Sequence, residues 1–134
     1  MKHRIAFVML CAMLMTCRLP AQSVDTSQWV GVWEGQLDGQ PGVTITLGRD
    51  AGDLQGTIVF NVVARENGQA HVIGHDAHVL THVNVNDNTL VFHVIRLGDS
   101  RELHLSMKRT ESNKALLDCS DCGGPRDTEL HRIH

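Results

Sequence analysis

The sequence predicts an all-β protein, an eight-stranded antiparallel up-and-down barrel. Short runs rich in Val, Ile, Thr and Leu recur at intervals of roughly ten residues, and several alternate apolar and polar side chains as half-buried strands do. The connections contain Gly, Asn, Asp, Ser or Pro, which form tight turns. Short connections favour antiparallel neighbours, and closure into a barrel removes exposed sheet edges. An open two-sheet β-sandwich is the alternative.

The expected strands follow one another along the chain. They cover residues 28–37, 43–49, 54–64, 78–85, 89–96, 101–109, 114–119 and 128–133, and residues 65–77 are expected to be a connection. Alternation within the clearest strands assigns eight apolar side chains to the interior. They would line the cup if the barrel binds a small apolar ligand, and otherwise they fill it: Ile58, Phe60, Val62, Phe92, Val94, Leu103, Leu105 and Met107.

The first 23 residues have the pattern of a signal peptide. Lys2 and Arg4 precede an apolar run over residues 5–15, and Ala21 and Ser23 provide the small residues that a signal peptidase requires. We therefore expect cleavage near Ser23, export to the periplasm or the extracellular space, and one domain over residues 24–134. An uncleaved anchor and a lipid anchor at Cys17 are the alternatives. No later segment is apolar enough to span a membrane.

Cleavage would leave an acidic domain. It removes three basic residues and no acidic one, so nine basic and 15 acidic residues remain and the formal net charge is about −6. Such a charge repels phosphate backbones, and we expect no nucleic-acid partner. Only Cys119 and Cys122 would remain of the cysteines, and in an oxidising compartment they are expected to form a disulfide. A thiol-disulfide catalyst and a zinc half-site are the alternatives for this pair.

The first strand carries a Gly-x-Trp motif, Gly31-Val32-Trp33. With the strand rhythm and the export signal, this motif resembles the small exported lipocalin-like domains of the calycin group. The resemblance implies an up-and-down barrel that holds a small apolar ligand. It also implies that Trp33 closes the barrel floor and that an arginine from the last strand, Arg132 with Arg109 as second candidate, packs across the indole. A guanidinium stacks favourably on an aromatic face.

Four of the nine histidines lie in HVIGHDAHVLTH, residues 71–82, at helical spacing. The β-branched residues and Gly74 in this segment disfavour a helix, so the spacing is not expected to gather four ligands. On the strand interpretation, His71 and His75 fall in the connection. His78 and His82 begin the strand 78–85 and share one face of it.

The strand interpretation predicts a different histidine cluster. Two-residue turns at residues 87–88 and 98–99 would place His82 opposite His93, and His93 opposite His104, on the outer face of the barrel. Opposed side chains on neighbouring strands are close enough for two imidazoles to share an ion, so Zn or Cu is the candidate metal. An exposed histidine patch without metal is the alternative. A slip of one residue in either turn would remove the alignment.

We identified no catalytic residue set in the sequence. Acidic residues are scattered over the loops, and neither a Gly-x-Ser-x-Gly elbow nor a phosphate-binding glycine loop is present. The sequence therefore predicts a non-catalytic protein. Three functions are compatible with it: a carrier of a small apolar ligand, a surface metal-binding protein that uses His82, His93 and His104, and an interaction or inhibitor module that acts through loops at the barrel end.

Overall fold

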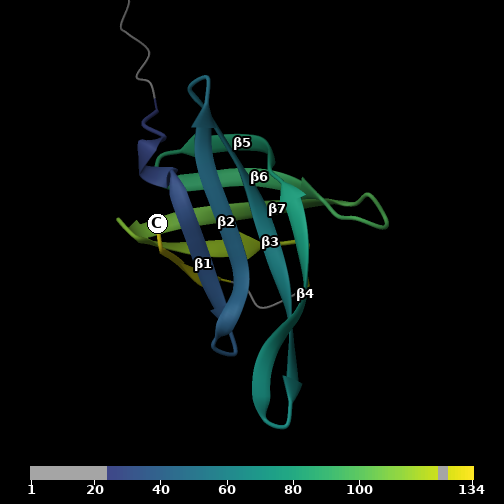
Figure 1. Ribbon diagram of the computed structural model, residues 1–134. Helices are drawn as coiled ribbons and strands as arrows, with labels where there is room; N and C mark the ends of the chain where they lie inside the picture. The colour runs from purple at the N-terminus through teal and green to yellow at the C-terminus, as the bar shows by residue number, and fades with distance from the viewer. Residues whose placement is uncertain (1–23, 124–126) are drawn as a thin grey trace, which may run out of the picture.

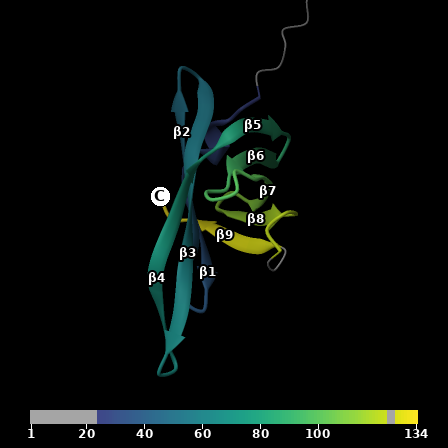
Figure 2. The ribbon, with the colours of Figure 1, turned by 90° about the vertical axis from the view of Figure 1, so that its right-hand side faces the viewer.

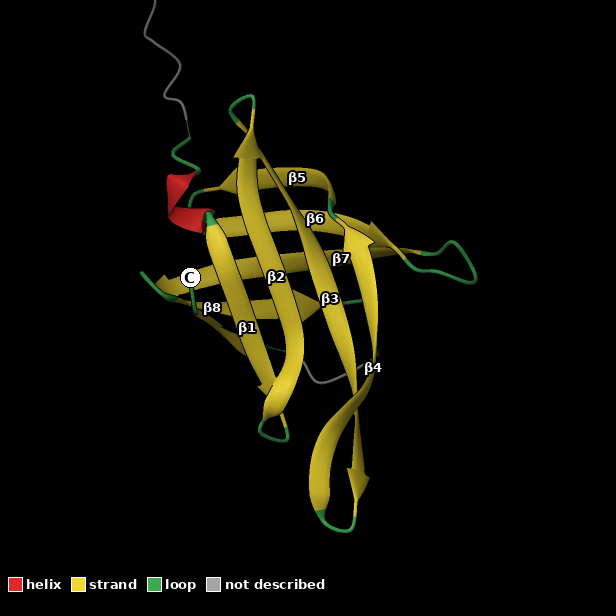
Figure 3. Ribbon diagram, in the orientation of Figure 1, coloured by secondary structure: helices red, strands yellow, loops and turns green. Residues whose placement is uncertain are grey.

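The computed structural model describes residues 24–123 and 127–134, so the expected signal peptide and Cys17 lie outside the described residues. A short 3-10 helix, η1 (Ser27–Trp29), precedes nine strands (Figure 3). The strands are β1 (Gly31–Leu37), β2 (Gln40–Asp50), β3 (Asp53–Glu66), β4 (Gln69–Val79), β5 (Thr81–Asn86), β6 (Thr89–Ile95), β7 (Glu102–Glu111), β8 (Lys114–Cys119) and β9 (Thr128–Arg132).

The nine strands form one antiparallel sheet that curls into a half-barrel. Their order is β4-β3-β2-β1-β9-β8-β7-β6-β5, so the first strand pairs with the last. Strands β1 to β4 make one layer, and β5 to β9 cross behind it at a steep angle (Figures 1 and 2). The predicted all-β class and antiparallel pairing are confirmed. The predicted strand count and closed barrel are wrong, and a single sheet replaces the two sheets of the alternative sandwich.

The additional strand is β4, which occupies the expected connection over residues 65–77. Its alternation is inverted, because Ile73 and Val79 are exposed whereas Asp76 and His78 face inward. Leu80 then forms the corner between β4 and β5, where its side chain is 6% exposed and its amide donates to the Gly56 carbonyl at 3.0 Å. The expected strand over residues 78–85 is therefore divided between two strands of the sheet.

The core lies between the two layers and includes two tryptophans. Trp29 and Trp33 are fully buried with ring centroids 6.3 Å apart, and Trp33 Nε1 donates to the Trp29 carbonyl at 2.9 Å. Arg132 pairs with Trp33 across β1 and β9, and its guanidinium carbon lies 4.5 Å from the centre of the indole. The predicted contact between Trp33 and Arg132 is thus present. The second candidate, Arg109, instead binds the Gln28 side chain.

Most of the predicted interior residues belong to this core. Phe60 packs against its edge, and six others are less than 9% exposed: Ile58, Phe92, Val94, Leu103, Leu105 and Met107. The predicted interior position of Val62 is wrong, because its side chain is 54% exposed. Beyond Phe60, β3 pairs with β4 alone. The far end of this hairpin extends past the layer of β5 to β9 (Figures 1 and 2). The six buried side chains pack with the other buried apolar residues, as expected if they form a core.

Candidate metal centre

The pairing of β6 with β7 aligns two histidines on the outer face of the sheet. His93 is the register partner of His104, and Ile95 is the partner of Glu102, as the turn at residues 98–99 predicts. The two imidazole rings lie edge to face with their centroids 4.3 Å apart. One half of the predicted histidine row is therefore confirmed.

The pairing of β5 with β6 differs from the prediction by one residue. Asn84 pairs with Val91 as expected, but a β-bulge follows and Thr81, rather than His82, is the partner of His93. His82 lies inside this bulge with a φ of 51°, an uncommon backbone conformation for a residue other than glycine. Bulges redirect side chains, and the His82 ring still lies 4.9 Å from the His93 ring.

A carboxylate from β7 completes a set of three ligand groups. Glu102 Oε1 contacts His93 Nδ1 and lies 3.8 Å from His82 Nδ1. His82, His93 and Glu102 each offer one ligand atom, and these atoms all lie within 4.8 Å of one another. The side chains of His82 and Glu102 are 72% and 41% exposed, so an ion can reach them from solvent. Sequence reasoning missed Glu102, although its even offset from His104 places both on one face of the strand.

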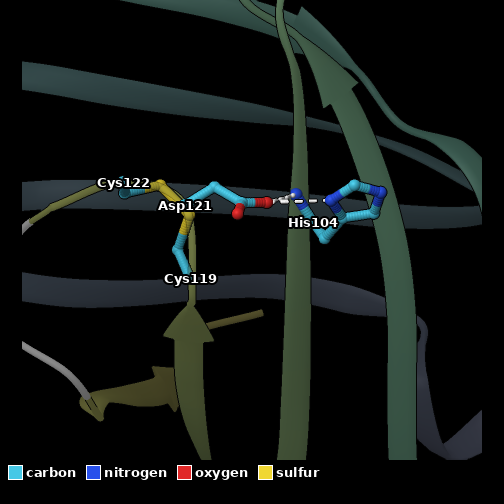
Figure 4. The surroundings of a disulfide bond; sticks show 4 residues. All are labelled: His104, Cys119, Asp121 and Cys122. Atoms are coloured by element: carbon cyan, nitrogen blue, oxygen red, sulfur yellow. Dashed lines mark hydrogen bonds and ion pairs between the residues drawn. A yellow bond between two sulfur atoms is a disulfide. The ribbon is translucent and has the colours of Figure 1, made fainter.

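His104 stands beside this set and is held by a different carboxylate. Asp121 Oδ2 lies 2.8 Å from His104 Nδ1 and accepts a second hydrogen bond from the His104 backbone amide at 3.1 Å (Figure 4). These two hydrogen bonds, that of the ring first, lower the pKa of the Asp121 carboxyl below its usual value. The predicted metal set of His82, His93 and His104 thus becomes His82, His93 and Glu102, with His104 as a neighbour.

The other histidines of HVIGHDAHVLTH lie on β4, which is a strand rather than a helix or a loop. His71 and His75 are exposed, and His78 faces inward. His78 Nε2 lies 2.8 Å from Asp76 Oδ2, and the His78 ring packs against the edge of Phe60. The expectation that His78 and His82 share one strand is wrong, because the corner at Leu80 separates them. None of these three histidines belongs to the set around Glu102.

The ligand chemistry of the set suits a borderline transition metal. Two imidazoles and one carboxylate are typical of Zn²⁺ sites that retain an open position, and imidazole also suits Cu²⁺. Ca²⁺ and Mg²⁺ prefer sites made of oxygen ligands alone. Within residues 24–123 and 127–134, this is the one group of three such ligands that lie close enough together. Cys119 and Cys122 form the predicted disulfide and are not available as thiolates.

A groove of about 870 Å³ lies between the β2–β3 hairpin and β5. Its apolar lining includes Leu54, Val79, Leu80 and Val83, and Asp50 contributes to its polar part. None of the eight predicted ligand-lining residues lies on it. The volume is within the usual range for small-molecule sites, and the groove adjoins the core, because Leu54 and Leu80 belong to both.

Comparison with known proteins gives no relative from which a function could be transferred. No protein-family model, curated protein or solved structure matches this chain. Among the described residues, no helix is both long enough and apolar enough to cross a membrane. The function is therefore inferred from the arrangement of the chain's own residues.

Proposed function

We propose that the protein binds one divalent transition-metal ion, Zn²⁺ or Cu²⁺, through His82, His93 and Glu102. The observation that carries this proposal is the approach of one ligand atom from each residue to within 4.8 Å of the others. Three neighbouring strands supply the three ligands, so the sheet holds them without a long loop. Glu102 contacts His93 Nδ1, so a carboxylate oxygen already lies beside a ring nitrogen that can bind the ion.

The exposure of the site favours reversible metal binding over catalysis. Metal-dependent hydrolysis benefits from a cavity that excludes water around the reacting groups. The His82 side chain is 72% exposed and stands on the outer face of the half-barrel, where water has access to the ion. Three ligands also leave a coordination position open for exchange with another ligand. A role in metal buffering or transfer follows from this geometry.

The Glu102→Gln variant tests the proposal. We expect wild-type protein to bind one Zn²⁺ per chain in a calorimetric titration. The variant should bind about 10- to 100-fold more weakly, because the neutral amide is a poorer ligand and no longer fixes the His93 ring. Glu129→Gln is the matched control, since Glu129 contacts a single histidine, His131, at 2.7 Å on the surface. Equal Zn²⁺ affinity in wild type and Glu102→Gln would show that Glu102 is not a ligand of the ion.

A second candidate function, small-molecule binding, rests on the groove between the β2–β3 hairpin and β5. Its apolar lining suits an apolar ligand at the edge of the core. Val79 lines the groove and is 69% exposed, so Val79→Asp changes the groove without disturbing the core. We expect this variant to bind a fluorescent apolar dye about tenfold more weakly, by the loss of one valine contact. Leu97→Asp, at a 71% exposed position outside the groove, should leave dye binding unchanged.

A further inference from the structure

Asp121 connects the disulfide to the histidine cluster. It lies between Cys119 and Cys122, and its Oδ2 contacts both the ring and the backbone amide of His104 (Figure 4). An ionised carboxylate only accepts hydrogen bonds, so His104 must donate from Nδ1. A neutral His104 ring then carries no proton on Nε2. Asp121 thereby fixes both the tautomer and the orientation of the ring.

The disulfide in turn holds Asp121 in this place. Cys119 is the last residue of β8 and the register partner of Leu105, which directly follows His104 on β7. The bond to Cys122 closes a small loop that contains Asp121 next to this strand pair. Apart from the disulfide, a hydrogen bond of 3.4 Å joins the Cys122 amide to the Cys119 carbonyl. Opening the disulfide would leave Asp121 held by this long hydrogen bond and by its own two hydrogen bonds to His104, so its position would be less well determined.

The ring of His104 limits the movement of His93. The two rings lie 4.3 Å apart with an angle of 77° between their planes, and His93 contacts the His82 ring on its other side. The His93 side chain is 28% exposed, less than that of either neighbouring histidine. A ligand whose ring is already oriented loses less conformational freedom when the ion binds. His104 thus stabilises the orientation in which His93 faces Glu102.

We propose that Asp121 is a positioning residue for the metal site and that the Cys119–Cys122 disulfide sets the affinity of that site for its ion. This inference rests on the proposed function of His82, His93 and Glu102. Reduction by a dithiol would transfer two electrons and two protons to the disulfide. The two cysteines become thiols and the dithiol becomes a disulfide. The released loop no longer clamps His104, and metal affinity falls.

The test replaces Cys119 and Cys122 with serine instead of reducing them, because the two thiols that reduction frees would themselves bind metal. We expect Cys119→Ser with Cys122→Ser to lower Zn²⁺ affinity about tenfold, by the loss of an outer-shell orienting contact. Asp121→Ala should have the same effect. Asp121→Asn, which retains an acceptor oxygen, should recover part of the affinity. Ser120→Ala is the matched control, because it alters the same loop and leaves Asp121 and the disulfide intact.

A second measurement tests the contact between Asp121 and His104 without any metal. ¹⁵N NMR of the metal-free protein above pH 8 should show His104 protonated at Nδ1 in wild type. It should show a shift toward the Nε2-protonated tautomer in the serine double variant and in Asp121→Ala. An unchanged tautomer would overturn the link between disulfide and His104. A changed tautomer with unchanged Zn²⁺ affinity would overturn the positioning role. If the variants show the tautomer shift but wild-type protein binds no Zn²⁺, the proposed function is refuted and the link between the disulfide and His104 stands.

Discussion

Replacing Trp33 with alanine is expected to lower the free energy of unfolding by about 3–5 kcal/mol, a large fraction of the stability of a small domain. The Trp33 side chain is fully buried between the two layers. The substitution removes its packing against Trp29, its stacking with Arg132, and the hydrogen bond from its Nε1 to the Trp29 carbonyl. It also leaves a cavity where β1 meets β9, the pairing that joins the two halves of the sheet.

Urea denaturation followed by circular dichroism measures this loss. Val62→Ala is the control: Val62 is 54% exposed, so its truncation should change stability by less than about 0.5 kcal/mol. If Trp33→Ala does not fold, Trp33→Phe keeps an aromatic ring but removes the indole hydrogen bond, and should cost about 1–2 kcal/mol. A Trp33→Ala protein as stable as Val62→Ala would show that Trp33 contributes little to the stability of the core.

The parts of the fold that follow from local turns could be predicted from the sequence. A two-residue turn at residues 98–99 predicts that His93 pairs with His104, and this register is confirmed. The loop itself is longer than predicted, because the hydrogen bond that closes it joins Arg96 and Arg101. In the structure Asp99 binds the Arg96 guanidinium and the Arg101 amide, which stabilises this loop. Hydrogen bonds from Arg96 and from the Arg101 amide, in that order, lower the pKa of Asp99 to about 2. The carboxylate thus remains ionised and able to bind both partners at ordinary pH.

The parts of the fold that depend on tertiary packing could not be predicted in this way. Strand β4 has apolar residues facing solvent and His78 facing the core, so its alternation gives the opposite of the usual signal. Leu80 forms a one-residue corner between β4 and β5, and the bulge at His82 places one extra residue in β5. No turn motif in the sequence predicts either feature. The bulge shifts the register by one residue. The His82 ring still lies beside the His93 ring, because a bulge also bends the strand and redirects its side chains.

The contact between Arg132 and Trp33 shows what the Gly-x-Trp resemblance explains. The two residues are register partners on the first and last strands, so their side chains lie next to each other wherever those strands pair. That pairing is present here although the sheet is a half-barrel with β4 and β5 at its two ends. The contact therefore does not require the closed barrel that the resemblance implied. Membership of the lipocalin-like group stays a prediction.

Replacing His93 with alanine should have the largest effect on metal binding, a loss of Zn²⁺ affinity on the order of 100-fold or more. Loss of a residue that only orients a metal ligand lowers metal affinity about 10- to 100-fold. His93 is itself a proposed ligand and lies at the centre of the cluster. Its Nδ1 contacts Glu102, and its ring lies against His82 on one side and His104 on the other. The variant removes one ligand and also the ring that separates the other two histidines.

The matched control for His93→Ala is His131→Ala. His131 is also on a strand and contacts a glutamate, Glu129, at 2.7 Å, but it belongs to no set of three ligands in the described chain. Calorimetry should show Zn²⁺ affinity unchanged in His131→Ala and nearly abolished in His93→Ala, with both variants close to wild type in stability. Equal losses in the two variants would mean that the protein binds zinc through scattered surface histidines. Retained affinity in His93→Ala would place any metal site elsewhere, since His82 and Glu102 supply too few ligands without the histidine between them.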